Sequence, residues 1–112
     1  MTGGKTRNGK GENRGAAARY DTLRSFFRGY LHQDYRLEHG SAEEAARAYR
    51  SAASQAELIA VASEWTEFGA AVKRLRWRDV KVALVRELGS SWQPASRREL
   101  ERLGSVLTGE AP

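Results

Sequence analysis

The residues of this chain that most resemble a chemical site lie between Tyr30 and Gly40, in the sequence YLHQDYRLEHG. The stretch contains His32, Asp34 and His39, and such side chains bind metal ions or transfer protons. Their spacing does not favour a metal site, because ligands at i, i+2 and i+7 do not share a helical face and the H-E-x-x-H spacing is absent. Only a turn could gather them.

A structural role explains the same residues without a metal or a cofactor. Short polar side chains commonly satisfy backbone groups where the chain turns. Asp34 would accept backbone N–H bonds at the end of a helix, and His32 would cap or pack there. We expect this structural role for the stretch.

The remaining candidates for acid–base catalysis are pairs of glutamates, Glu43 with Glu44 and Glu64 with Glu67. Such catalysis needs two groups held in a cleft whose surroundings separate their pKa values. These glutamates have basic neighbours three or four residues away, such as Arg47, which is typical of a solvated helix face. The sequence therefore predicts no enzyme.

Length and composition indicate one small domain. The chain has 112 residues, of which 40% are hydrophobic, and no cysteine, which excludes disulfides and Cys-ligated zinc and suits a reducing compartment. No apolar run approaches the roughly 20 residues that cross a bilayer, and no apolar block follows the basic N-terminus. We expect a soluble, cytoplasmic protein.

The positive charge is unevenly distributed. The net charge is +5, and residues 1–18 contribute three of these charges through four basic side chains and one acid. This Gly-rich segment has too few apolar residues to offset the entropy of ordering. We expect a disordered basic tail at 1–18 and a nearly neutral folded domain at 19–112.

Helical periodicity runs through that domain, and strand alternation is missing. Three S-x-x-E capping boxes mark helix starts, at Ser41–Glu44, Ser54–Glu57 and Ser96–Glu99. The expected helices begin near residues 18, 41, 54, 78 and 96. Five amphipathic helices with short connections predict a compact all-α bundle.

Apolar spacing also predicts which residues form the core. The expected buried stripe of the long third helix is Leu58, Val61, Trp65, Phe68, Val72 and Leu75, and that of the fourth is Val80, Leu84, Val85 and Leu88. Gly69 interrupts the first stripe, which predicts a bend or the close approach of another helix.

Nucleic-acid binding is the main alternative function. The segment KRLRWRDVK gathers Lys73, Arg74, Arg76, Arg78 and Lys81, and with the tail it could contact phosphates. Acidic residues alternate with the basic ones on the following helix, however, which is typical of an ordinary mixed surface.

Two of the three tryptophans are candidate anchors for a protein interface. Trp65 lies on the predicted core stripe, whereas Trp77 and Trp92 lie in or beside loops. A partly exposed indole there could bind a partner or could cover a small core.

The order of these features resembles one family. The helix YDTLRSFFRGYLHQDY, a loop that ends in Gly, an Ala-rich helix, a long helix and the segment ELGSSWQP before a last helix are similar to bacterial contact-dependent growth inhibition immunity proteins. The resemblance covers about residues 20–107. Its most specific part is the run Tyr30, Leu31, His32, Gln33 and Asp34, where the family has a similar Tyr-Phe-His-Gln-Asp run.

The resemblance implies a helical antitoxin without turnover. It would bind the toxin domain that a neighbouring cell delivers and occlude its active site or substrate path, as a monomer until it meets the toxin. In such a protein Tyr30, His32, Gln33 and Asp34 form a structural motif that fixes how the next segment departs from the first helix.

The resemblance leaves two binding surfaces open. The toxin could present an acidic surface to the KRLRWRDVK segment, or it could bind an acidic side formed by Glu43, Glu44, Glu57, Glu64 and Glu67, together with Trp77 or Trp92. Many toxins of these systems are nucleases with basic clefts, and much of the basic excess lies in the tail. Both points favour the acidic side, and nucleic-acid contacts are expected only weakly, through the tail.

Overall fold

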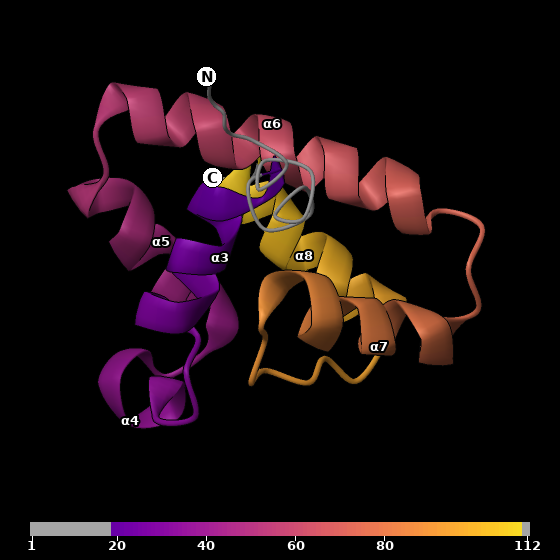
Figure 1. Cartoon of the computed structure of the whole chain (residues 1–112). Helices are drawn as coiled ribbons and strands as arrows, with labels where there is room; N and C mark the ends of the chain where they lie inside the picture. The colour runs from indigo at the N-terminus through magenta and orange to yellow at the C-terminus, as the bar shows by residue number, and fades with distance from the viewer. Residues whose placement is uncertain (1–18, 111–112) are drawn as a thin grey trace, which may run out of the picture.

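The structure, a computed structural model, describes residues 19–110 and contains six α-helices in that range (Figure 1). They are α3 Asp21–Tyr30, α4 Tyr35–His39, α5 Ala42–Ala52, α6 Gln55–Val72, α7 Trp77–Leu88 and α8 Arg97–Leu107. The predicted all-α fold is confirmed, and the short helix α4 adds a sixth helix to the five expected. The tail predicted at 1–18 lies outside the described residues.

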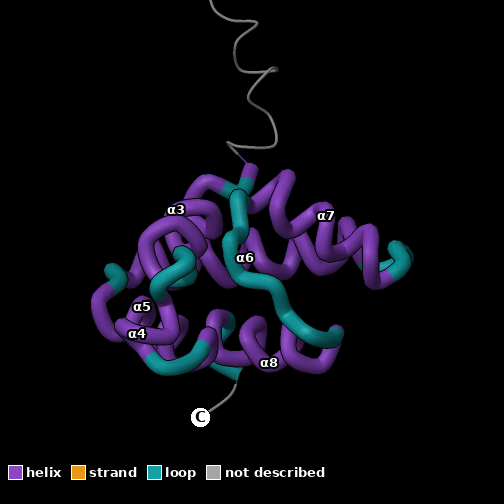
Figure 2. Tube along the Cα trace, turned by 90° about the horizontal axis from the view of Figure 1, so that it is seen from below, coloured by secondary structure: helices purple, strands orange, loops and turns teal. Residues whose placement is uncertain are grey.

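The longest helix, α6, spans one side of the molecule, and the other helices lie beneath it (Figure 1). α3, α4 and α5 lie beneath its first half, and α7 and α8 beneath its second half. α8 also contacts α5, which closes the bundle. Seen from below, the connection between α7 and α8 crosses the near face of the molecule (Figure 2).

The centre of the core is α3. Its apolar residues Leu23, Phe26 and Phe27 recur at helical spacing, and each is at most 1% exposed. Tyr20, just before the helix, meets Phe68 of α6 edge to face at 5.7 Å. Because α3 packs against α5, α6 and α7, its burial holds both halves of the bundle together.

All three predicted serines cap their helices. Each accepts a hydrogen bond from the backbone N–H three residues later, in Ser41, Ser54 and Ser96. Only the second box is complete, because the Glu57 carboxylate also accepts the backbone N–H of Ser54 at 2.8 Å. Glu44 binds Arg47 instead, and Glu99 accepts from the residue before its serine. The boxes therefore predict the helix starts correctly but not every bond.

The close helix approach lies at a different glycine from the one predicted. α6 continues through Gly69 without interruption, and a Cβ there would meet nothing within 4 Å. Gly104 of α8 is buried instead, and a Cβ there would overlap the indole of Trp65 on α6. The two helices cross where one of them lacks a side chain.

Two residues predicted in the core are exposed. Leu75 is 39% exposed, because α6 ends at Val72 and the chain turns away. Val85 is 54% exposed, because α7 buries the face of Val80, Leu84 and Leu88 and the residue after Leu84 is turned about 100° from it. The apolar character of α7 thus extends beyond its buried face.

Candidate partner-binding surfaces

His32 organises the turn after α3. Its Nδ1 accepts a hydrogen bond from the backbone N–H of Asp34 at 3.1 Å. The ring proton is therefore on Nε2, which donates a hydrogen bond to Glu38 Oε1 at 3.0 Å. Asp34 begins α4, but its side chain makes no capping hydrogen bond. The accepting role predicted for Asp34 is therefore wrong: the His32 imidazole holds the turn by accepting the N–H of Asp34 itself, and the Asp34 side chain accepts no N–H in the first turn of α4.

The aromatic residues of the same stretch pack against α5. The Tyr30 ring stacks on His39 at 5.6 Å and meets Tyr49 edge to face at 5.4 Å. His39 Nε2 lies 3.8 Å from Glu38 Oε1, and Gln33 is exposed. Among residues 19–110 no three His, Asp or Glu side chains are placed to hold a metal ion. This part of the chain fixes the path from α3 to α5.

The five glutamates predicted as an acidic side lie on two helices, Glu43 and Glu44 on α5 and the other three on α6. Glu43 and Glu44 lie in the first turn of α5, and Glu57 lies in the first turn of α6. The intervening helix of 11 residues is about 16 Å long.

Each of these glutamates also has a partner within the chain. The contacts are Glu43 with Arg102 at 3.7 Å, Glu44 with Arg47 at 2.6 Å, Glu57 with the Ser54 N–H at 2.8 Å, Glu64 with the Leu23 N–H at 2.8 Å and Glu67 with Arg19 at 3.3 Å. A carboxylate that already has a cation or an N–H group would have to give it up or share it to bind a partner. Binding of a toxin by these residues stays a prediction, which the geometry does not favour.

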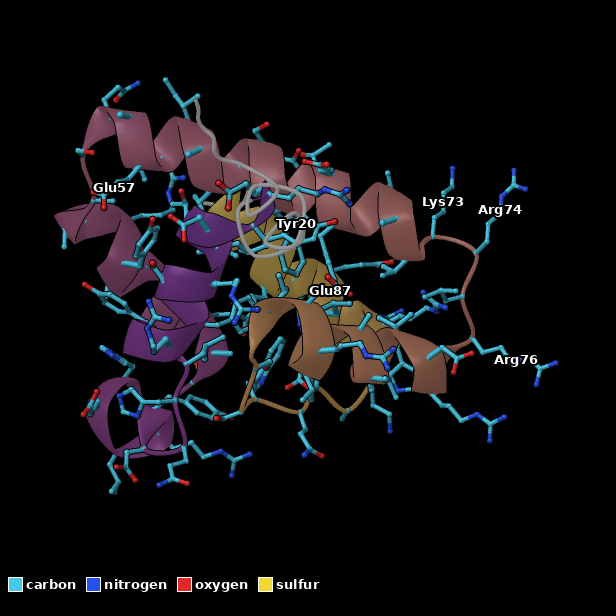
Figure 3. The ribbon with its side chains drawn as sticks, viewed as in Figure 1. Tyr20, Glu57, Lys73, Arg74, Arg76 and Glu87 are labelled. Atoms are coloured by element: carbon cyan, nitrogen blue, oxygen red, sulfur yellow. The ribbon has the colours of Figure 1, made fainter. Side chains whose placement is uncertain are left out.

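The basic side chains of residues 73–81 differ from these glutamates, because they have no ion-pair partner within residues 19–110. Lys73, Arg74 and Arg76 project from the α6–α7 connection away from the body of the molecule (Figure 3). Arg78 and Lys81 continue the series along α7, and all five side chains are exposed. Their charge is available to a partner.

The two loop tryptophans differ in accessibility. Trp92 is only 3% exposed and packs near Phe27, with 6.5 Å between ring centroids. Trp77 is half-buried, and the guanidinium of Arg97 lies 5.9 Å from its ring centre. Arg97 also donates to the carbonyl of Leu75, so it ties the start of α8 to the α6–α7 connection. An anchoring role stays a prediction for both, and Trp77 offers more surface for it.

A groove on α7 is a feature that the sequence pattern did not indicate. It has a volume of about 590 Å³ and lies between α7 and the connection that follows it. Val82 and Val85 line it and are 52% and 54% exposed, and Trp92 and Pro94 line its other side. The one available signal was Val82, an apolar residue off the buried stripe of α7.

A second hollow, of about 360 Å³, lies beside Tyr49 and is lined by Asp21 and Glu57 among others. The Tyr49 hydroxyl is buried and has no hydrogen-bond partner in the described part of the chain. Burial raises the pKa of the Tyr49 phenol, and the negative charges of Glu57 and Glu64 raise it further. Both effects disfavour the phenolate form of Tyr49.

Residues 19–102 match the model of the CdiI immunity protein family. This range begins just before α3 and extends into α8. Comparison with curated proteins and with solved structures finds no match. No helix in residues 19–110 is long and apolar enough to cross a membrane.

Proposed function

Because the chain belongs to the CdiI immunity protein family, we propose that it binds the toxin domain delivered by a neighbouring cell and neutralises it by covering the active site or the substrate path. The observation that carries the proposal is the family match, which covers three quarters of the chain. The chain acts in the cytoplasm of the cell that it protects, and it does so by binding rather than by turnover.

The fold suits such a role physically. Its helices pack around the buried face of α3, and serines cap three of them, so the surface is preorganised and little ordering entropy is lost on binding. A standard interface takes about 800 Å² from each partner, which is more than one short helix can present. We therefore expect the toxin to contact more than one segment of the chain.

Co-expression tests the proposal. The test takes the toxin domain from the reading frame upstream of the gene of this chain, where a large gene that ends in a toxin domain is expected, and expresses it under an inducible promoter. With the full-length chain present, growth should continue and the two proteins should co-purify. An unrelated toxin domain serves as the specificity control. Growth arrest by the cognate domain despite ample folded immunity protein would refute the proposal.

A second candidate function is nucleic-acid binding, which the unpaired basic side chains from Lys73 to Lys81 favour. Binding that depends on charge alone would weaken steeply with salt, through counterion release. Sequence-specific binding that persists near physiological salt, together with failure to rescue growth, would make this the primary function.

A further inference from the structure

The groove on α7 combines an apolar floor with a basic rim. Val82 and Val85 lie three residues apart on one side of the helix, and both are more than half exposed. Trp92 and Pro94, which are both buried, also line the groove. A single exposed valine is ordinary, but two valines on one side of a helix, in a groove lined by further apolar side chains, expose apolar surface that water solvates poorly.

The rim of the groove is formed by Arg78, Lys81 and Arg86. All three are exposed, and none makes an ion pair within residues 19–110. Between residues 73 and 86 the chain carries six basic residues and a single acid, Asp79. The groove therefore lies in a region of positive potential that extends to the α6–α7 connection.

From this combination we propose that the groove docks an acidic segment of the toxin domain, whose apolar side chains cover Val82 and Val85 while its carboxylates pair with Arg78, Lys81 and Arg86. The inference rests on the proposed function and adds to it the binding face and the chemistry of the partner surface. Lys73, Arg74 and Arg76, which project beyond the groove (Figure 3), would attract the acidic segment from a distance and speed association.

Charge and polarity decide between the occupants of this groove. A second copy of the chain would bring one basic rim against another, and the repulsion would oppose association. A nucleic acid would pair with the rim, but its phosphates would gain nothing from the two exposed valines. An acidic polypeptide with apolar side chains satisfies both parts of the groove.

Two double variants of the full-length chain test the proposal. Val82→Ser/Val85→Ser removes the apolar floor, and Lys81→Glu/Arg86→Glu reverses the rim. Matched controls are Leu37→Ser/Ile59→Ser, at residues that are 89% and 62% exposed outside the groove, and Arg28→Glu/Arg36→Glu, with the same charge change on α3 and α4. Thermal melting verifies that each variant is folded before its binding is measured.

Calorimetric titration with the toxin domain encoded next to this chain gives the readout. We expect the floor variant to weaken binding about tenfold or more and the rim variant to weaken it about a hundredfold, with a smaller dependence of the affinity on salt. The controls should bind within about twofold of the wild type.

The outcomes separate this inference from the proposed function. A wild-type chain that does not bind the toxin domain refutes both. If both groove variants bind the toxin domain as tightly as the wild type does, the groove is not the binding site, whereas the proposed function stands.

Two further measurements cover the other occupants. Duplex DNA and RNA titrations near physiological salt that reveal specific binding, lost in the rim variant, would assign the groove to nucleic acid. Light scattering that shows a wild-type dimer, lost in the floor variant, would assign it to a second copy. Either result overturns the proposal.

Discussion

The indole of Trp65 on α6 lies directly over Gly104 of α8, at the point where the two helices cross. Trp65 is half-buried, and Gly104 is buried beneath it. The helices approach closely because Gly104 has no side chain, so a bulky residue and a glycine together define the crossing. Two substitutions of the same kind, at Gly104 and Gly69, separate this packing role from the helix propensity of glycine.

Gly104→Ala should destabilise the protein by about 3 kcal/mol, because the added methyl overlaps the indole and the crossing must widen. Gly69→Ala should stabilise it by about 0.5–1 kcal/mol, because Gly69 is exposed within a helix where a methyl meets nothing. Urea unfolding of both variants measures the difference. Equal effects of the two substitutions would contradict the crossing described above.

His32→Ala should destabilise the protein by about 1 kcal/mol, because the N–H of Asp34 loses its acceptor and Glu38 loses its donor. Asp34→Ala should change the free energy of unfolding by less than about 0.5 kcal/mol, since the Asp34 side chain is exposed and caps nothing. Chemical denaturation measures the free energy of unfolding of both variants. A larger loss of stability in Asp34→Ala than in His32→Ala would show that the Asp34 side chain does cap the helix.

Glu64→Gln should destabilise the protein by about 1 kcal/mol without weakening toxin binding. The carboxylate accepts the N–H of Leu23, one of the donors that the first turn of α3 leaves unpaired. A negative charge at that helix start adds a favourable interaction with the helix dipole. Unfolding and toxin titration are measured on the same preparation, and weaker binding at unchanged stability would place Glu64 in the interface.

Tyr49→Phe should stabilise the protein at pH 7 by about 1 kcal/mol, because it removes a buried hydroxyl without a partner. Burial raises the pKa of Tyr49 above its ordinary value near 10. The wild type therefore has its full stability below that value and loses stability as the pH rises through the folded-state pKa.

The gain from Tyr49→Phe should accordingly be larger at pH 10.5 than at pH 7. Thermal melting at the two pH values measures it. Tyr35→Phe is the control, because the Tyr35 hydroxyl accepts a hydrogen bond from Arg36 and its removal should give no gain. A Tyr49→Phe variant less stable than the wild type at pH 7 would show that the hydroxyl is satisfied.

Five of the six helices could be predicted from the sequence, because capping serines and apolar spacing are local signals. The helix α4 could not, since it has five residues and no buried side chain. Leu75 and Val85 were placed in the core because spacing alone does not reveal where a helix stops or how wide its buried face is.

The candidate site was harder to predict than the fold. Spacing indicates the pair of Glu44 with Arg47, but the partners of Glu64 and Glu43 are the distant residues Leu23 and Arg102. Likewise, Val82 becomes part of a groove only when Pro94 folds back beside α7. Both features depend on tertiary contacts that no local pattern encodes.

Titration calorimetry of the full-length chain into its adjacent toxin domain tests the central claim most directly, with the mass of both proteins measured afterwards. Neutralisation by binding predicts a one-to-one complex with a dissociation constant of about 10 nM or tighter and unchanged masses. Absence of a complex in a pair that still protects cells, or a covalent change in the toxin produced by substoichiometric immunity protein, would contradict the account.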